Sequence, residues 1–448
     1  MKYYLLFALI MSVFAFESFP QVFWDEVPTG VSVQLNSVSN VSGQVAWACG
    51  QNGTVIKTTN NGYNWTNVSG NGIPNTTSLV SISAYDANTA LTAGYVGANT
   101  FLYRTTNAGL NWSQVFTQAN GFINTVWVIP LSFAFMQGDP VGGRWSLWKT
   151  SNYGLTWDSA GLYLPQAGSE TGWNNSFWFF GGKIWFGTNN TKIYHSSTNG
   201  TSWLSYSTTG LTDIYTVSFD TNTYNNTGGG YAGGISLMKS TNTGQNWSAV
   251  TVPGAGNIYG AVKTLLYPNG SWITRGSSIY YSNNFGVNWT TQFTTTTGTY
   301  THLARYKSLG FFTGPGYMYA TKSNGGISRA NLFVEGVKLI SSEVPEAFRL
   351  FQNYPNPFNP TTKIIFSQAR LSGNATDMRG AFISLKVYDA IGREAAVLHD
   401  KIIQPGTYEA EWDASNMPSG IYYYRLLVSD PVSNTLIFQQ ARKMVLIK

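Results

Sequence analysis

Three carboxylates in the first three quarters of the chain are placed so that they could act together. Only nine Asp and Glu residues lie between positions 21 and 340, so the choice is small. The candidates for catalysis are Asp139 in "GDPVGGR", Glu170 in "AGSETGW" and Asp213 in "LTDIY". Two carboxyl groups held ~5 to 10 Å apart can hydrolyse a glycosidic bond, one as acid and the other as nucleophile or base. The chemistry open to this chain is therefore carbohydrate hydrolysis or carbohydrate binding.

Arg144, Trp145 and Trp173 flank these carboxylates and are the candidates for ligand binding. A guanidinium can bind hydroxyl groups, and an indole ring offers a flat surface on which a sugar can stack. The alternative is that Asp139 caps its own turn and pairs with Arg144, while the other two carboxylates are solvated. That alternative is favoured because charged loop residues are common. We therefore expect a binding or scaffold module for a glycan or a protein, with a glycoside hydrolase as the rival.

Other chemistries find little support in the sequence. The three histidines, His195, His302 and His399, have no spacing typical of a metal site, so we expect neither metal nor cofactor. The lone cysteine, Cys49, lies in the apolar stretch "VAWACG" and is expected to be a buried core residue. The net charge of +6 is not concentrated in any run of Lys or Arg, which argues against nucleic-acid binding.

The N-terminus has the pattern of an export signal. "MKYYLLFALIMSVFAFES" begins with a basic residue and continues with a short apolar run. That run is too short to span a bilayer comfortably and lies where a secretory signal peptide belongs. The pattern predicts a signal peptide within residues 1–20, with the cleavage site left open, and a mature chain without a transmembrane span.

An eight-residue phrase recurs along the chain and indicates the elements that position these side chains. It reads "TTNNGYNW" from Thr58, and its closing tryptophans fall at positions 65, 112, 157, 203, 247 and 289. Intervals of 47, 45, 46, 44 and 42 residues, each holding several short alternating strands, are typical of β-propeller blades. Each phrase is expected to form the hairpin between the third and fourth strands of a blade. In the third blade, "WDSAGL" is the expected fourth strand.

Each phrase is expected to have a structural role. Its Asn can hydrogen-bond the loop backbone, while its Gly takes a positive φ that other residues resist. The fourth copy has Thr198 in place of Asn, so its turn is expected to be held less well. The structural residues predicted on this basis are Asn60, Gly62, Trp65, Asn107, Gly109, Trp112, Asn152, Gly154, Trp157, Gly200, Trp203, Asn242, Gly244, Trp247, Asn284, Gly286 and Trp289.

The spacing also predicts seven blades within residues 22–332. Trp24 lies 41 residues before Trp65, and "WDEV" repeats the pattern of "WTNV". The N-terminal strand is therefore expected to complete the last blade, which leaves no free sheet edge. That last blade has a degenerate turn, "SNGG", from Ser323.

A basic residue or histidine precedes each of the first five phrases. Two interpretations remain open: the side chains pack beside their own turns with solvated charges, or they form an arc that contacts an anionic polysaccharide. These residues are Lys57, Arg104, Lys149, His195 and Lys239.

The repeated phrase resembles the Asp-box, or BNR, repeat, with Asn where that family usually has Asp. The longer frame "AWACGQNGTVIKTTNNGYNW" is similar to the repeat of propellers related to photosystem II assembly factors and to sialidases. The resemblance implies a seven-bladed propeller in which the box is structural. A sialidase would also require an arginine triad and an early Arg-Ile-Pro motif. This chain has no such motif, which counts against sialidase activity.

The C-terminal segment has a different style. "FQNYPNPFNPTTKIIF" from Phe351, "LKVYDAIGREAAVL" from Leu385 and "GTYEAEWDASNMPSGIYYYRLLV" from Gly406 are alternating strands with Pro and Gly turns. They predict a small β-sandwich over 345–448 after a linker at 333–344, and hence an all-β protein. This segment resembles the type A C-terminal sorting domain of the type IX secretion system. The resemblance implies the secretion machinery as a partner, and release or surface attachment in a Gram-negative bacterium.

Overall fold

The chain divides into two compact units, one spanning Val22–Leu332 and one within Phe333–Lys448. All the secondary-structure elements in the described residues are β-strands, which agrees with the predicted all-β fold. The predicted signal peptide lies outside the described residues. The computed structural model describes residues 22–42, 44–129, 133–220, 228–264, 270–305, 318–332, 337–341, 343–371, 380–415, 417–430 and 435–448.

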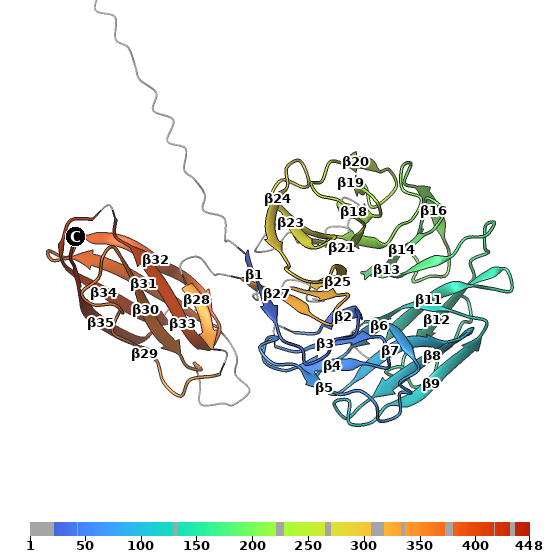
Figure 1. Ribbon diagram of the computed structural model, residues 1–448, viewed down its shortest axis with the longest axis horizontal. Coiled ribbons are helices and arrows are strands. Elements are labelled where there is room, and N and C mark those ends of the chain that lie inside the picture. The colour runs from blue at the N-terminus through green and yellow to red at the C-terminus, as the bar shows by residue number, and fades with distance from the viewer. Residues whose placement is uncertain are drawn as a thin grey trace, which may run out of the picture. The chain divides into compact units, whose positions relative to one another are not determined.

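The first unit is a ring of seven antiparallel sheets, which confirms the predicted seven-bladed propeller (Figure 1). Each blade begins with its innermost strand. Blade one is formed by β2 (Leu35–Asn40), β3 (Ala46–Gly50), β4 (Val55–Thr58) and β5 (Thr66–Asn67). Blade two is formed by β6 (Ser78–Ala84), β7 (Ala90–Val96), β8 (Asn99–Thr105) and β9 (Ser113–Ala119). Blade three is formed by β10 (Ile123–Val128), β11 (Ala134–Val141) and β12 (Arg144–Thr150).

Blades four to seven follow in the same order. They are formed by β13 (Gly172–Phe180), β14 (Lys183–Thr188), β15 (Lys192–Ser196) and β16 (Leu204–Ser207); β17 (Thr216–Phe219), β18 (Gly230–Gly233), β19 (Leu237–Ser240) and β20 (Ser248–Val250); β21 (Ile258–Thr264), β22 (Gly270–Arg275), β23 (Ser278–Ser282) and β24 (Thr290–Thr294); and β25 (Tyr300–Arg305), β26 (Met318–Lys322), β27 (Ile327–Leu332) and β1 (Val22–Val27).

The core of the ring lies between neighbouring blades. Trp47 of the first blade clusters with Leu79, Tyr103 and Trp112 of the second. Because both faces of each second strand are covered in this way, the segment Ala46–Gly50 is apolar or small throughout and completely buried. Cys49 belongs to this buried strand, as predicted.

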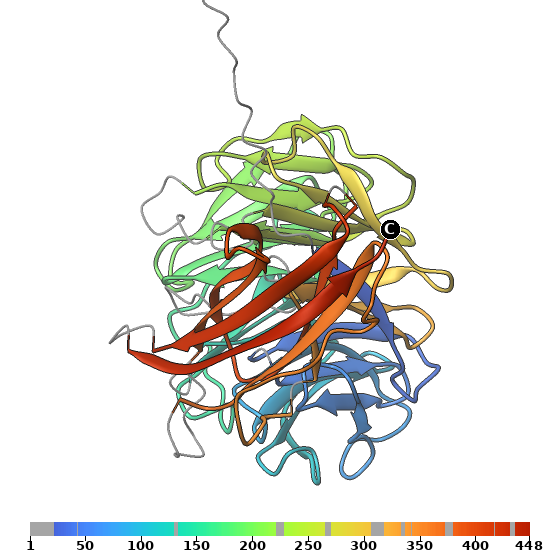
Figure 2. The ribbon, with the colours of Figure 1, turned by 90° about the vertical axis from the view of Figure 1, so that its left-hand side faces the viewer.

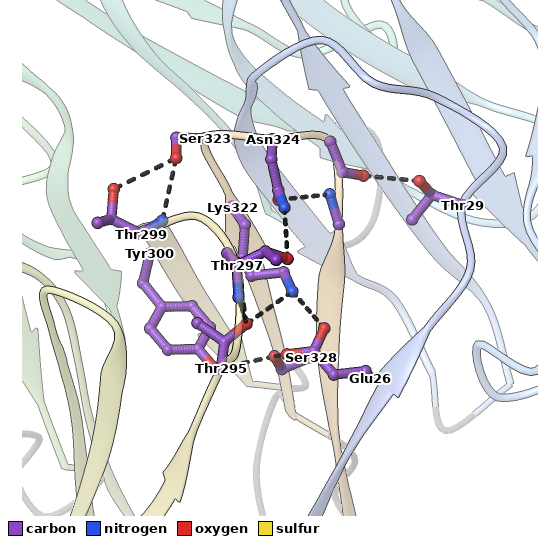
Figure 3. A network of polar contacts seen from close by, with 12 residues as sticks. Glu26, Thr29, Thr295, Thr297, Thr299, Tyr300, Lys322, Ser323, Asn324 and Ser328 are labelled. Carbon is purple, nitrogen blue, oxygen red and sulfur yellow. Dashed lines mark hydrogen bonds and ion pairs between the residues drawn. The ribbon is translucent and has the colours of Figure 1, made fainter.

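The N-terminal strand closes the seventh blade. β1 pairs antiparallel with β27 from Val22↔Leu332 to Val27↔Ile327, as the spacing of Trp24 predicts. Figure 3 shows the polar contacts that accompany this closure. The buried ammonium of Lys322 forms an ion pair with Glu26 of β1 and donates a hydrogen bond of 3.0 Å to Thr295. The two ends of the propeller chain therefore complete one sheet.

Two details of the blades differ from the prediction. Blade three has no fourth strand within the described residues, because "WDSAGL" contributes a single bridge between Lys149 and Asp158. The chain there turns at Gly161, with a φ of 75°. The sequence "SNGG" joins β26 to β27, so it is a hairpin between second and third strands rather than a degenerate box.

The six box turns share one backbone geometry. Two consecutive residues have left-handed φ values, as in Asn61 (60°) and Gly62 (76°). The amide of Gly62 donates to the hydroxyl of Thr58 at 3.0 Å, and the amide of Asn64 donates to the side-chain oxygen of Asn60 at 3.0 Å. In the fourth turn, the Thr198 hydroxyl accepts the equivalent bond from Ser202 at 2.9 Å. The prediction that this turn is held less well is therefore wrong, since a hydroxyl oxygen replaces the amide oxygen.

Each box glycine also lies against the preceding blade. A Cβ atom on Gly109 would lie 2.7 Å from Cβ of Val68 in blade one. One on Gly154 would lie 2.6 Å from a methyl group of Leu91 in blade two. The box turns therefore form the seams between blades, where only glycine meets both the backbone and the packing requirements.

The second unit is a sandwich of two four-stranded sheets, which confirms the predicted sandwich (Figure 2). A shared core includes Ile364, Tyr408, Ile383 and Tyr424. One sheet has the order β28 (Val337–Ser341), β33 (Gly406–Asp413), β30 (Thr361–Gln368) and β29 (Arg349–Leu350); the other has the order β32 (Glu394–Ile403), β31 (Ala381–Asp389), β34 (Gly420–Ser429) and β35 (Leu436–Leu446).

The predicted linker at 333–344 is wrong for its central residues. Val337–Ser341 forms strand β28, which pairs with β33, and Val337 is buried in the sandwich core. The alternation of buried and exposed residues in "VKLIS" is that of a strand with one face on the core. The sandwich therefore begins at Val337, eight residues before the predicted start.

Candidate functional site

Register shifts interrupt the innermost strands of the propeller near their first residues. They occur at the starts of β2, β6, β10, β13, β21 and β25. A β-bulge leaves a residue out of the ladder and re-aims its side chain, which is why bulges often lie next to functional sites. We call this end of the propeller the bulge face, and the opposite end, where the box turns lie, the box face.

Three aromatic side chains lie next to one another on the bulge face and form what we call the aromatic arc. Trp173 belongs to the bulge of β13, Tyr215 directly precedes β17, and Tyr259 is the displaced residue of β21. The ring centroids of Trp173 and Tyr215 are 4.6 Å apart, and those of Tyr215 and Tyr259 are 4.8 Å apart. Tyr259 is 37% exposed, and the other two rings are half-buried. Neighbouring blades four, five and six thus present a continuous row of rings.

Polar groups accompany the arc. The indole N–H of Trp173 donates to Asp213 at 3.2 Å, and the amide nitrogen of Asn257 donates to the Tyr259 hydroxyl at 3.1 Å. Burial raises the pKa of the Tyr215 hydroxyl, and the charge of Asp213 adds to that effect. Tyr215 therefore stays a neutral hydroxyl beside a carboxylate, so the arc combines flat apolar surfaces with hydrogen-bonding groups.

A wide bulge in blade four holds Trp173 in place. Four residues of β13 lie opposite one residue of β14, and Asn175 within the bulge has a φ of 59°. The Asn175 amide donates to the backbone oxygens of Asn36 at 3.2 Å and Val80 at 3.0 Å, in blades one and two. It also accepts a hydrogen bond of 2.9 Å from Ser37. The strand that carries Trp173 is therefore tied to blades on the other side of the ring.

Asp139 supports the same strand. One of its oxygens accepts hydrogen bonds of 2.8 Å from the Asn124 side chain and of 2.8 Å from the backbone amide of Gly172. Burial raises the pKa of the Asp139 carboxyl, although these two hydrogen bonds oppose the rise. Asp139 and Asp213 thus each accept a hydrogen bond from one of two consecutive residues of β13, Gly172 and Trp173.

Glu170 does not join them. Its side chain is 0% exposed and accepts hydrogen bonds from Lys192 at 2.6 Å, Tyr194 at 2.6 Å and Asn190 at 3.1 Å. A carboxylate with three donors and no exposed surface can neither receive a substrate nor exchange a proton with one. The prediction of Glu170 as a catalytic residue, and the alternative that it is solvated, are both wrong.

Trp145 is likewise unavailable to a ligand. It is 0% exposed and packs on Phe186, with the ring centroids 4.8 Å apart. The prediction of Trp145 as a ligand-binding residue is wrong, because its alternation along β12 directs the ring into the seam between blades. Arg144, which begins that strand, is exposed on the bulge face beside the hairpin Gly142–Gly143.

Three of the basic residues before the boxes connect neighbouring blades, whereas Lys149 donates to Ala160 of its own blade at 3.0 Å. The ammonium of Lys57 donates to the backbone oxygen of Ala108 at 3.3 Å, and Arg104 donates to that of Tyr153 at 2.7 Å. Each acceptor is the first left-handed residue in the box turn of the next blade. Lys239 donates in the same way to Phe285 at 3.5 Å. These contacts favour a structural role over an arc that binds an anionic polysaccharide.

The series contains a member that sequence reasoning missed. Arg329 of blade seven donates to the backbone oxygen of Asn61 in blade one at 2.8 Å, so the connections continue across the closure. The sequence did contain a signal: Arg329 ends "ISR" in the third strand of its blade, just as Lys57 ends "VIK" in the third strand of blade one. Blade four differs, because the Trp185 indole makes the connection, donating to Thr243 at 2.9 Å.

His195 is buried beside Trp185, with the ring centroids 4.6 Å apart. Burial, together with the charge of Lys183, lowers the pKa of His195 to about 4. The imidazole is therefore neutral at pH 7, unlike the other residues that precede a box.

This shift predicts an acid-labile propeller. His195 protonates near pH 6.5 in the unfolded chain and near 4 in the folded one, so its contribution is present above pH 6.5 and is lost as the pH falls. The free energy of unfolding should fall by about 3 kcal/mol between these values. Urea titrations from pH 7.5 to 4 measure it, and His195→Gln should remove this part of the slope. An unchanged slope in the variant would contradict the assignment to His195.

Sequence reasoning also missed Tyr215 and Tyr259, although a signal was present. "DIY" at Asp213 and "NIY" at Asn257 each consist of a polar residue, an isoleucine and a tyrosine, and they lie 44 residues apart. The interval is one blade, so the two tyrosines occupy equivalent places at the starts of innermost strands.

Family models match both units of the chain. Residues 25–131 match the model described as photosynthesis system II assembly factor YCF48, and residues 352–438 match the secretion system C-terminal sorting domain. No curated protein matches the chain. The sorting domain implies interaction with the type IX secretion machinery, as predicted.

Solved propellers share the fold at low sequence identity. A structure of YCF48 bound to D1 peptide is 15% identical, with a TM-score of 0.53, over 68% of this chain and 96% of that one. YCF48 from Cyanidioschyzon merolae is 15% identical, with a TM-score of 0.53, over 68% and 98%. The WD40 propeller domain of Doa1 is 11% identical, with a TM-score of 0.50, over 70% and 97%. These likenesses establish the propeller and leave its ligand open.

Two features are absent from the described residues. No helix in them is long and apolar enough to cross a membrane. No group of His, Cys, Asp and Glu side chains among them is arranged to hold a metal ion. The chain is a secreted or cell-surface protein of a Gram-negative bacterium, composed of a BNR-type propeller similar to photosystem II assembly factor YCF48 and a type IX secretion C-terminal sorting domain.

Proposed function

We propose that the propeller is a glycan-binding module whose aromatic arc receives sugar rings outside the cell. The observation that carries this proposal is the contact of Trp173, Tyr215 and Tyr259 across three neighbouring blades. Sugar rings have apolar faces that stack on aromatic side chains and hydroxyl edges that need polar partners. Asp213 and the tyrosine hydroxyls supply such partners beside the rings. The rigid strands that carry the arc suit recognition without a large conformational change.

A binding screen with matched variants tests the proposal. The purified chain is applied to an array of plant, fungal and bacterial polysaccharides, and hexasaccharides of the strongest hit are titrated by calorimetry. Trp173→Ala and Tyr259→Ala should each weaken binding about tenfold, which corresponds to ~1.4 kcal/mol. Tyr163→Ala removes an exposed aromatic side chain outside the arc and should leave the affinity unchanged. Equal affinities for all variants would exclude the arc as the binding site.

A peptide is the rival ligand, because a similar propeller is described as bound to D1 peptide. The array result separates the two. Absence of glycan binding by a folded chain that binds peptides from a display library through Trp173 would replace the glycan with a peptide.

The glycoside hydrolase alternative keeps Asp139 and Asp213. The raised pKa of Asp139 is the property expected of a general acid, and it is the observation that favours this alternative. Against it, the Asp139 oxygen already accepts two structural hydrogen bonds. Incubation of the hits with the chain, followed by reducing-end analysis, tests it. Cleavage that disappears in Asp139→Asn while binding persists would establish an enzyme.

A further inference from the structure

The charged groups around the aromatic arc differ in how far their hydrogen bonds are satisfied. Arg275 begins the hairpin after β22, beside the strand that carries Tyr259. Its guanidinium donates to the backbone oxygens of Val252 at 2.9 Å, Gly256 at 3.0 Å and Ile235 at 3.0 Å. Those donors hold two loops together, so they are not available to a carboxylate or sulfate of a ligand.

Lys192 is engaged in a similar way. It lies in blade four and pairs with the fully buried Glu170 at 2.6 Å. Releasing Lys192 to an anionic ligand would leave a buried carboxylate without its cation, which is strongly unfavourable. Lys192 is therefore also committed to the fold.

Asp213 is the charged group that contacts the arc itself. One of its oxygens accepts the Trp173 indole hydrogen at 3.2 Å, and the side chain is only partly buried. A carboxylate has about four acceptor positions, so Asp213 retains capacity to accept hydrogen bonds from ligand hydroxyl groups. The arc thus offers acceptors and a negative charge, while the fold already engages the hydrogen-bond donors of Arg275 and Lys192.

We propose that the arc selects uncharged sugars over uronic or sulfated ones, with Asp213 as the specificity-determining residue. This inference rests on the proposed glycan-binding function. Asp213 accepts hydrogen bonds from the hydroxyl groups of a neutral sugar stacked on one ring of the arc, since the planes of Trp173 and Tyr215 meet at 77°. The same carboxylate repels a ligand carboxylate or sulfate that approaches the rings.

The expected size of the discrimination follows from Coulomb's law. A charge ~6 Å from Asp213 in a partly hydrated site loses about three- to tenfold in affinity relative to a neutral group. The loss should shrink at 0.5 M salt, where screening acts over a few ångströms. Asp213→Asn keeps an oxygen for the Trp173 indole and removes the charge, so it isolates the electrostatic effect.

The experiment compares neutral and acidic polysaccharides on one array. Cellulose, xylan, mannan and starch represent the neutral class, and polygalacturonate, alginate and chondroitin sulfate the acidic class. We expect the strongest binding in the neutral class. Asp213→Asn should weaken the binding of the best neutral ligand. The affinity for the best acidic ligand, divided by that for the best neutral ligand, should rise about three- to tenfold. Asp158→Asn, an exposed carboxylate at a box turn, serves as the matched control.

Each outcome decides one of the two proposals. Strongest binding to acidic polysaccharides, or an unchanged preference in Asp213→Asn, would overturn the selection of uncharged sugars and leave the glycan-binding function standing. Acidic binding that disappears in Arg144→Gln would assign it to the exposed guanidinium on blade three. Absence of binding to every polysaccharide by a folded chain would overturn the glycan-binding function itself, and this inference with it.

Discussion

Gly109→Ala is expected to lower the free energy of unfolding of the propeller by about 3 kcal/mol. A left-handed conformation costs an L-residue roughly 1–2 kcal/mol, and Gly109 has a φ of 87°. The new Cβ would also lie 2.7 Å from Cβ of Val68, where neither atom is the end of a flexible side chain. Overpacking of this kind costs about 1–3 kcal/mol. Urea unfolding followed by tryptophan fluorescence measures the loss, since every tryptophan except Trp412 belongs to the propeller.

Gly161→Ala separates the two contributions. Gly161 has a φ of 75°, and a Cβ atom there would meet nothing within 4 Å. Its substitution should therefore cost only the backbone strain of about 1–2 kcal/mol. Equal losses in the two variants would mean that the seam between blades one and two adjusts to the extra methyl group.

Asp220→Asn is expected to cost about 3 to 5 kcal/mol, because it leaves a buried ammonium without its counterion. Asp220 and Lys263 form an ion pair between blades five and six, with side chains only 3% and 9% exposed. Asparagine can still accept the hydrogen bond that Gly229 donates to Asp220, so the loss reports on the charge. Thermal and urea unfolding of the purified variant, followed by tryptophan fluorescence, measure it.

A double variant and an exposed pair serve as controls for this prediction. Asp220→Asn combined with Lys263→Met should recover much of the stability, since an apolar side chain replaces the unpaired charge. Glu409→Gln breaks the more exposed pair with Lys363 in the sandwich, whose unfolding Trp412 reports, and should cost at most about 1 kcal/mol. Equal effects of Asp220→Asn and Glu409→Gln would refute a special role for burial.

The blades could be predicted because their signals are local. Each box turn is built from residues within eight positions of one another, and the hydrogen bonds that Thr58 and Asn60 accept come from amides only four residues along the chain. The closing strand was predictable for a related reason, since Trp24 continues the same interval. Chemistry that is complete within a hairpin leaves a mark in the sequence wherever the hairpin recurs.

The site was less predictable because it depends on distant partners. Trp173 and Asp213 meet 40 residues apart, and Asn175 reaches 139 residues back to Asn36. Glu170 seemed a loop carboxylate, yet Lys192 and Tyr194 of the following sheet enclose it. Trp145 is buried and Trp173 is half-buried because the first alternates along β12 and the second lies in the bulge of β13, and neither strand's register is visible in the sequence. Exposure and pairing of this kind arise from the ring as a whole.

The pairing of β1 with β27 also has a mechanical consequence. The chain leaves the propeller at Leu332, at the box face, whereas the aromatic arc lies at the bulge face. A pull between a ligand held at the arc and the chain beyond Leu332 therefore runs from one face to the other, along β27. The hydrogen bonds of β27 to β26 and to β1 lie across that direction. Such a pull loads the hydrogen bonds of β27 to both neighbouring strands at the same time, instead of breaking them one by one. The pairing with β1 therefore increases the resistance of β27 to being pulled out of the propeller.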